Sequence, residues 1–177
     1  MLNYFSRIFT LTAFIFLLSA CTSLPDGIQP VKNFELPRYL GTWYEIARLD
    51  HPFERGLEQI SAQYSMLDDG GIKVLNRGFN IAQQEWEEAD GKAYFVGNSD
   101  TAHLKVSFFG PFYASYVIFL LDMQGYEYAM ITGPDRDYLW ILARQTSLPE
   151  DTLNTLVQHA KDNGYATDSL IYVDHTP

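Results

Sequence analysis

The sequence has a single cysteine, Cys21, among its 177 residues. No disulfide can form within such a chain, so its stability has to come from a buried core. Basic residues are also few, because 12 Lys and Arg stand against 22 Asp and Glu and give a formal net charge of −10. An acidic chain argues against nucleic acid as a partner and against binding to anionic lipid surfaces by charge.

The motifs of common catalytic and metal sites are missing as well. The sequence holds no G-x-S-x-G, no H-E-x-x-H and no phosphate-binding loop. Its four histidines are scattered without the spacing of metal ligands, so we expect neither a metal site nor a cofactor. The sequence therefore predicts that the protein is not an enzyme, although a Ser–His–Asp arrangement that forms only in the folded chain stays open.

The hydrophobic run at the N-terminus is too short to span a membrane. It extends from residue 8 to residue 20, whereas a spanning helix needs about 20 apolar residues, and it ends in small residues. We therefore predict a cleaved signal peptide over residues 1–20. The tetrad at residues 18–21, Leu-Ser-Ala-Cys, resembles the lipobox of bacterial lipoproteins, whose cysteine is acylated and becomes the first mature residue. An ordinary secretion signal that leaves Cys21 as a buried thiol is the alternative.

The residues after Cys21 predict where the protein is located. In the sorting of enterobacterial lipoproteins, which this segment resembles, Thr22 in place of Asp points to the outer membrane. We expect a lipid-anchored protein on the periplasmic face of the cell outer membrane. Residues 21–36 contain Pro25, Gly27 and Pro30 and little periodicity, as a lipid anchor and tether would. Residues 37–177 then form one domain.

Apolar and polar residues alternate with period two from residue 41 onward, and turn signals separate the alternating stretches. The pattern predicts eight antiparallel strands, the first opening at residue 41 and the last ending at residue 144. The period then changes to that of one α-helix, which ends near residue 164, and a short final strand follows. Eight such strands can close into an up-and-down barrel that holds one small ligand, or they can form a sandwich, and alternation alone does not decide.

Three short segments resemble the signatures of one family, the lipocalins. Gly41 and Trp43 form a G-x-W at the start of the first strand, residues 133–138 read Gly-Pro-Asp-Arg-Asp-Tyr, and Arg144 closes the last strand. Residues 38–48 and 105–113 are similar to the lipid-anchored outer-membrane lipocalins of bacteria, and more distantly to the apolipoprotein D group. The resemblance implies an all-β, eight-stranded antiparallel up-and-down lipocalin barrel with one C-terminal α-helix and a short final strand. It also implies that Arg144 stacks on Trp43 as part of the scaffold, and it alone suggests a homodimer.

Alternation along the strands also predicts which side chains face the interior of a barrel. The expected inward residues are Ile60, Ala62, Tyr64, Met66, Val74, Asn76, Leu104, Val106, Phe108, Tyr116, Ile118, Leu120, Tyr138, Trp140 and Leu142. Among them, we expect these to contact a ligand: Asn76, Tyr116, Trp140, Tyr64, Phe108, Ile118 and Tyr138. The alternative is that they fill a solid core, and a register error of one residue would turn a whole strand over.

Three further features concern the two ends of the predicted barrel. Glu45 shares parity with Trp43, so we expect it to point inward and to pair with an arginine near the barrel floor. In lipocalins the loop after the first strand, here residues 51–56, covers the open mouth, which makes Phe53 a rim residue unless the loop packs on itself. The aromatic run at residues 108–113 is expected to be rim, membrane contact, dimer surface or simple turn packing.

A mainly apolar interior with a few polar groups suits an acyl chain. The sequence therefore predicts a protein that binds, stores or carries fatty acids or lysophospholipids in the cell envelope, in membrane maintenance under stress. The alternative of a different class is a periplasmic lipid-modifying enzyme on the same barrel, which turnover of lysophospholipid would reveal.

Overall fold

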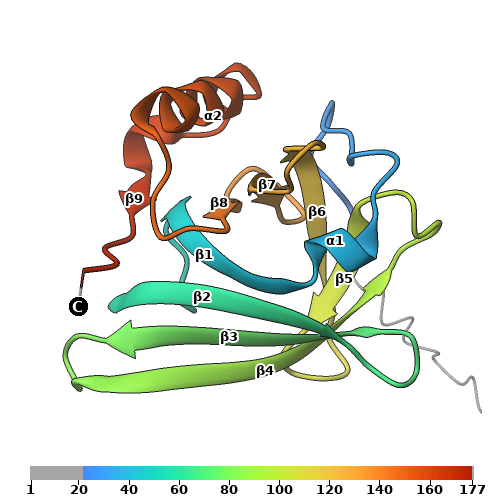
Figure 1. Cartoon of the computed structure of the whole chain (residues 1–177), viewed down its shortest axis with the longest axis horizontal. Coiled ribbons are helices and arrows are strands. Elements are labelled where there is room, and N and C mark those ends of the chain that lie inside the picture. The colour runs from blue at the N-terminus through green and yellow to red at the C-terminus, as the bar shows by residue number, and fades with distance from the viewer. Residues whose placement is uncertain (1–21, 177) are drawn as a thin grey trace, which may run out of the picture.

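Eight antiparallel strands close into a barrel in the computed structural model, which describes residues 22–176 (Figure 1). The strands are β1 (Gly41–Arg48), β2 (Leu57–Met66), β3 (Ile72–Asn80), β4 (Glu85–Phe95), β5 (His103–Ser107), β6 (Ala114–Leu121), β7 (Tyr128–Thr132) and β8 (Leu139–Ala143). Each strand bonds to the next in sequence, and β1 bonds to both β2 and β8. The up-and-down barrel is thereby confirmed and the sandwich is excluded.

The remaining elements lie around this barrel. They are α1 (Leu36–Tyr39), α2 (Glu150–Asp162), the short 3-10 helix η1 (Thr167–Ser169) and β9 (Ile171–Tyr172). Helix α2 lies outside the barrel and buries Leu156 and Ala160 against residues of β1, β7 and β8. Strand β9 pairs with the end of β1, so the predicted C-terminal helix and final strand are confirmed. Within residues 22–176, no helix has both the length and the hydrophobicity that a membrane crossing requires. The predicted signal peptide and Cys21 lie outside the described residues.

The up-and-down order gives the barrel two different ends. The loops at residues 67–71, 96–102 and 122–127 meet at one end, where α1 also lies and Arg38 donates hydrogen bonds to the backbone carbonyls of Met123 and Gln124. This end is referred to below as the closed end. The loops at residues 49–56, 81–84, 108–113 and 133–138 meet at the other end, the mouth.

Turn chemistry accounts for the tight hairpin between β2 and β3. Gly70 adopts a φ of +83°, a left-handed conformation that favours glycine. The Asp69 carboxylate accepts a hydrogen bond from the Gly71 N–H at 2.9 Å, and the Leu67 N–H donates to the Gly71 carbonyl at 2.8 Å. These contacts explain why an Asp-Asp-Gly-Gly sequence marks a turn.

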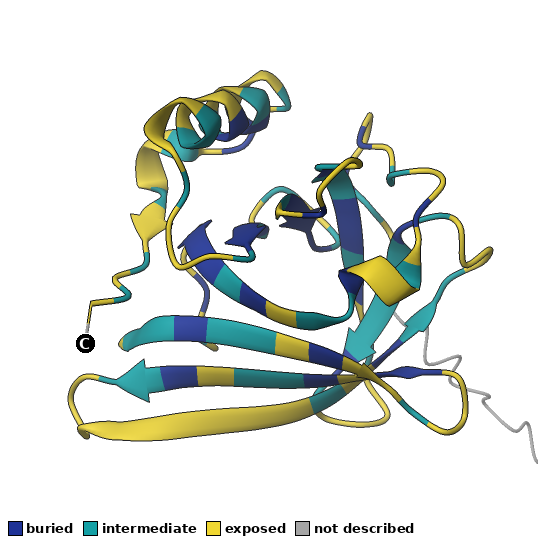
Figure 2. Cartoon of the chain, viewed as in Figure 1, coloured by how far each residue is buried: buried dark blue, intermediate teal, exposed yellow. Residues whose placement is uncertain are grey.

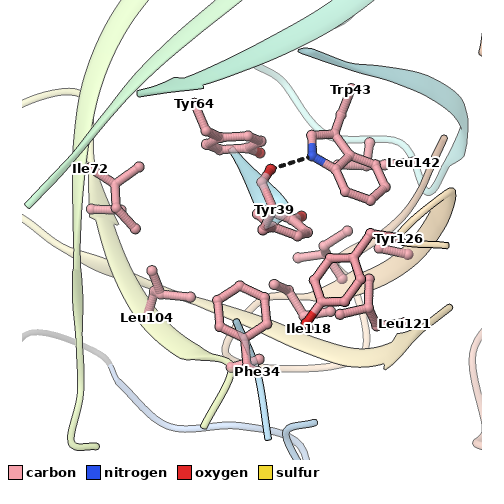
Figure 3. Close-up of a cluster of buried hydrophobic side chains, with 14 of the residues drawn as sticks. Phe34, Tyr39, Trp43, Tyr64, Ile72, Leu104, Ile118, Leu121, Tyr126 and Leu142 are labelled. Atoms are coloured by element: carbon pink, nitrogen blue, oxygen red, sulfur yellow. Dashed lines mark hydrogen bonds between the residues drawn. The ribbon is translucent and has the colours of Figure 1, made fainter. Parts of the chain in front are cut away.

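Two clusters of buried side chains hold the structure together. One lies inside the barrel around Trp43, Tyr39 and Tyr64, which lie next to one another in Figure 3. The other lies between α2 and the outer face of the strands. Figure 2 shows that most of β4 is exposed, in contrast to β7 and β8. The core is therefore concentrated on the side of the barrel that α2 covers.

Two of the inward assignments are wrong. Leu120 belongs to the outer cluster, because a register shift between Ile118 and Leu120 reverses the alternation within β6. Met66 is 52% exposed, since it ends β2 at the closed end, where the chain turns away from the barrel. The other predicted inward residues belong to the inner cluster or line the cavity described below.

Candidate ligand-binding site

A tryptophan and an arginine seal the closed end of the barrel. Trp43 is fully buried, and its indole N–H donates a hydrogen bond of 2.7 Å to the Tyr39 carbonyl (Figure 3). The guanidinium carbon of Arg144 lies 4.0 Å from the centroid of the Trp43 ring, a cation–π geometry. The same guanidinium donates to the backbone carbonyls of Thr42 and Arg38 at 2.8 and 2.7 Å. These contacts tie the first strand to the last, as a scaffold role requires.

Gly41 belongs to the same arrangement. Its φ is +95°, which L side chains rarely adopt, and a Cβ at this position would lie 3.5 Å from an Arg144 nitrogen. A glycine at the start of β1 therefore lets the chain turn into the barrel next to the arginine.

Between the closed end and the mouth, the barrel contains a cavity. The cavity has a volume of about 440 Å³, within the range of about 300–1,000 Å³ that is usual for small-ligand sites. Its wall includes exposed side chains at the mouth, such as Phe53 and Phe109, so the cavity opens to the outside. A filled barrel, which would have excluded a carrier role, is not what the structure contains.

The structure brings most of the predicted ligand contacts together on the cavity wall. Six of the seven line it: Asn76, Tyr116, Trp140, Tyr64, Phe108 and Tyr138. Ile118 does not line it, because its side chain is fully buried within the inner cluster. Whether these six residues contact a ligand stays a prediction.

Three tyrosines form a hydrogen-bonded chain in the cavity wall. The Tyr116 hydroxyl lies 2.8 Å from the hydroxyl of Tyr39 and 2.8 Å from that of Tyr64. Burial raises the pKa of all three phenols above the ordinary value near 10, so they stay neutral. This tyrosine triad adds polar groups to an otherwise apolar wall without adding charge.

A network of charged side chains lies nearer the mouth. Arg48 donates a hydrogen bond of 2.9 Å to the Glu45 carboxylate, and its Nε lies 3.6 Å from a Glu54 oxygen. The same Glu54 oxygen lies 2.9 Å from His51 Nε2 and accepts a hydrogen bond of 3.3 Å from the Trp140 indole. Since Arg48 also donates to the Glu54 carbonyl, this network fastens the loop 49–56 to the barrel wall.

The two carboxylates of this network differ in their electrostatics. Burial, and then repulsion by Glu54, raises the pKa of Glu45 well above its ordinary value, although Arg48 opposes the shift. Burial alone would raise the pKa of Glu54 as well. The hydrogen bond with His51 and the charges of His51 and Arg48 outweigh burial there, so the pKa of Glu54 is lowered. Glu54 is therefore the more acidic of the two carboxylates.

Glu45 points inward as expected, but its predicted partner is wrong. Its arginine is Arg48, which lies on the same strand toward the mouth, rather than an arginine at the floor. The cause is a register shift between Glu45 and Ala47, which turns residues 45 and 48 to the same face of β1. Both residues then lie opposite wall residues, because Glu45 pairs with Leu142 and Arg48 pairs with Trp140.

Sequence reasoning missed Tyr39, His51 and Glu54. Tyr39 precedes the first strand, so period-two alternation gives no information about it. His51 and Glu54 lie in a loop, and only their spacing of three residues indicated that they could meet. Asn76, by contrast, was expected, and its Oδ1 is buried without a hydrogen-bond partner among the described residues. No group of three or more His, Cys, Asp or Glu residues within residues 22–176 could hold a metal ion.

Comparison with known proteins agrees with this geometry. A family model described as a lipocalin-like domain matches residues 34–175. Outer membrane lipoprotein Blc of Vibrio cholerae serotype O1 is 52% identical over 157 residues, which cover 89% of this chain and 92% of that protein. Apolipoprotein D of Macaca fascicularis is 33% identical over 165 residues, which cover 90% of this chain and 84% of that protein. The solved structure of insecticyanin from the tobacco hornworm Manduca sexta matches with a TM-score of 0.69 at 18% identity and 87% coverage of each chain, which is a likeness of fold.

Proposed function

Since this chain belongs to the lipocalin-like domain family, we propose that it is a lipid-anchored carrier that binds fatty acids or lysophospholipids in the cell envelope. Membrane maintenance under stress is the setting that we propose for it. The observation that carries the proposal is the open, mainly apolar cavity inside the barrel. A solid barrel of the same topology would offer no place for a ligand.

The mechanism that we propose is partition. An acyl chain that enters the cavity leaves water and gains about 25 cal/mol for each Å² of apolar surface that it buries. Phe108, Tyr138 and Trp140 would contact it near the mouth, and the tyrosine triad would lie at the deeper part of the wall. The polar headgroup would stay at the mouth, where the network of Arg48 and Glu54 offers charged partners.

The lipid anchor is a proposal that rests on the sequence. The lipobox predicts acylation at Cys21, with residues 1–20 removed, residues 21–36 as anchor and tether and residues 37–177 as the lipocalin domain. The relative from Vibrio cholerae is named an outer membrane lipoprotein, which supports the same location for this chain, on the periplasmic face. Replacement Cys21→Ser should release the protein into the soluble fraction, and a variant that stays with the membrane would contradict the anchor.

Native mass spectrometry of the protein purified from its own host tests the carrier function. We expect a bound fatty acid or lysophospholipid at one molecule per chain, and its mass would identify it. The same spectrum measures whether the protein is a homodimer. An empty protein that also fails to take up added lysophospholipid would contradict the proposal.

The alternative, a lipid-modifying enzyme, is tested on the same preparation. Incubation with lysophospholipid should leave the lipid intact and bound in a one-to-one ratio. Release of more than one equivalent of free fatty acid would show turnover. It would contradict the carrier function and show that the protein is an enzyme.

A further inference from the structure

Exposed phenylalanines surround the mouth of the cavity. Phe109 and Phe112, in the turn between β5 and β6, are 72% and 67% exposed, and Phe53, in the loop after β1, is 71% exposed. Phe53 and Phe109 also line the cavity, so this apolar surface continues into the interior. These three residues are referred to below as the aromatic rim. An exposed apolar surface of this kind marks a site of contact with a lipid or protein surface.

The N-terminal tether lies against the same hairpin that carries Phe109 and Phe112. The Ser115 hydroxyl, at the start of β6, donates a hydrogen bond to the Ser23 carbonyl. The His103 ring, at the start of β5, hydrogen-bonds with the backbone of Thr22. The chain is therefore held on the outer wall of β5 and β6 up to the residue that follows Cys21.

This attachment limits how far a lipid on Cys21 can lie from the hairpin. Two residues of extended chain span at most about 7 Å, so Cys21 cannot move further than that from Ser23. The turn with Phe112 is three residues from Ser115, a separation of at most about 11 Å. Acyl chains on Cys21 would bring the membrane to the wall formed by β5 and β6, which carries the aromatic turn at its mouth end and the contact of Thr22 with His103 at its other end.

We propose that the aromatic rim docks on the phospholipid surface that holds the anchor, so that the mouth of the cavity faces the bilayer. This inference rests on the proposed lipid anchor and carrier function. A lipid could then pass between the bilayer and the cavity along a continuous apolar surface, without exposing its chain to water.

The charges around the mouth identify the kind of lipid surface. The side of the mouth next to the aromatic turn belongs to β4, which pairs with β5 and whose exposed residues include four acids: Glu85, Glu87, Glu88 and Asp90. With a net charge of −10 for the chain, an anionic surface would repel this side. We therefore expect docking on zwitterionic phospholipid through apolar contact, and added anionic lipid should weaken it.

Fluorescence quenching on the full lipidated chain tests the docking. The chain would be reconstituted into zwitterionic phosphatidylcholine vesicles whose acyl chains carry bromine, which quenches tryptophan on contact. Phe112→Trp places a reporter in the aromatic turn, and Met123→Trp, at the closed end where Met123 is 40% exposed, is the matched control. The signal of the unsubstituted chain, with its three native tryptophans, is subtracted.

We expect bromine to quench at least half of the added signal of Phe112→Trp and to leave that of Met123→Trp unchanged. Protein that floats with the vesicles while neither reporter is quenched would overturn the docking and leave the anchor standing. Protein that fails to float would overturn both. The Phe112→Trp reporter could instead be shielded from water without being quenched by bromine, in a chain that cross-links as a dimer. That result would show that the aromatic turn contacts a second copy of the chain, and it would overturn the proposal.

A second variant tests the consequence for transfer. Phe112 does not line the cavity, so Phe112→Ser should bind a lysophospholipid offered in detergent solution as tightly as the parent does. Uptake from vesicles should become roughly tenfold slower, because the rim loses one of its apolar contacts with the bilayer. Equal uptake rates for variant and parent would overturn the proposal.

Discussion

Removal of the Trp43 side chain should destabilise the barrel more than most single substitutions. The indole is fully buried, and its N–H is the donor to the Tyr39 carbonyl. Truncation of a buried tryptophan to alanine costs about 3–5 kcal/mol. For a domain of this size, each kcal/mol lowers the melting temperature by about 2–4 °C, so Trp43→Ala should lower it by about 6–20 °C.

Further variants separate the contributions to this loss. Trp43→Phe keeps an aromatic ring under Arg144 but removes the indole N–H and part of the buried ring. We expect a loss of about 1–3 kcal/mol from the unpaired Tyr39 carbonyl, in addition to the lost packing. A double-mutant cycle between Trp43→Ala and Arg144→Ala isolates the stacking of the guanidinium on the ring, which lies 4.0 Å away. The coupling should be about 0.5–2 kcal/mol.

Thermal and urea unfolding followed by circular dichroism measures the parent and all of these variants. A decrease in the free energy of unfolding below about 1 kcal/mol for Trp43→Ala would refute the packing of Trp43 at the closed end, because removal of a buried tryptophan costs more than that. Strictly additive losses in the cycle would refute the stacking with Arg144 and leave the packing of Trp43 intact.

Three more variants address the cavity. Tyr116→Phe removes the hydroxyl that joins the tyrosine triad and should lower the free energy of unfolding in urea by about 1–3 kcal/mol, whereas the exposed Tyr172→Phe should change it little; equal effects would contradict the triad. Because burial raises the pKa of Glu45, the folded chain holds that proton more tightly than the unfolded chain, and its stability falls as pH rises from the ordinary value near 4.5 through the raised one. Calorimetry should therefore show the parent losing stability relative to Glu45→Gln as pH rises, and a constant difference would count against the shift. Asn76→Leu should weaken binding of lysophospholipid about tenfold in a titration and leave that of a fatty acid within about twofold, whereas equal losses would exclude a contact with the headgroup region.

Alternation predicted most of the barrel because it is a local property of the chain. Where one face of a strand is buried, side-chain parity follows directly from the order of residues, as at Ile60, Ala62 and Tyr64. Parity fails where a strand contains an irregularity. The register shift after Ile118 moved Leu120 to the outer face, and nothing in the apolar run of β6 indicates where that shift occurs.

Segments without periodicity could not be placed from sequence. Residues 22–35 are rich in turn signals, yet Ile28 and Phe34 are almost fully buried and Phe34 lines the cavity. The contacts that hold this segment come from distant parts of the chain, because the Val31 N–H donates to the Ile118 carbonyl and the Val31 carbonyl accepts from Ala102. The position of such a segment depends on hydrogen bonds with the folded barrel, so it cannot be predicted from the sequence of the segment alone.

One polar group of the cavity, the Asn76 side chain, favours lysophospholipid over fatty acid as the proposed ligand. The hydroxyls of the tyrosine triad are paired with one another, so the triad needs no ligand to satisfy it. The charged network is held by ion pairs, but Arg48 Nε and the His51 ring nitrogens have no hydrogen-bond partner among the described residues. Asn76, midway along β3, presents an acceptor: its buried carbonyl oxygen has no donor among the described residues, and a buried acceptor left in this state costs about 1–3 kcal/mol. An ionised fatty acid has no donor to offer this oxygen, whereas the glycerol hydroxyl of a lysophospholipid does. The proposed ligand that relieves this cost is therefore the lysophospholipid, held with its chain in the cavity and its glycerol at the level of Asn76.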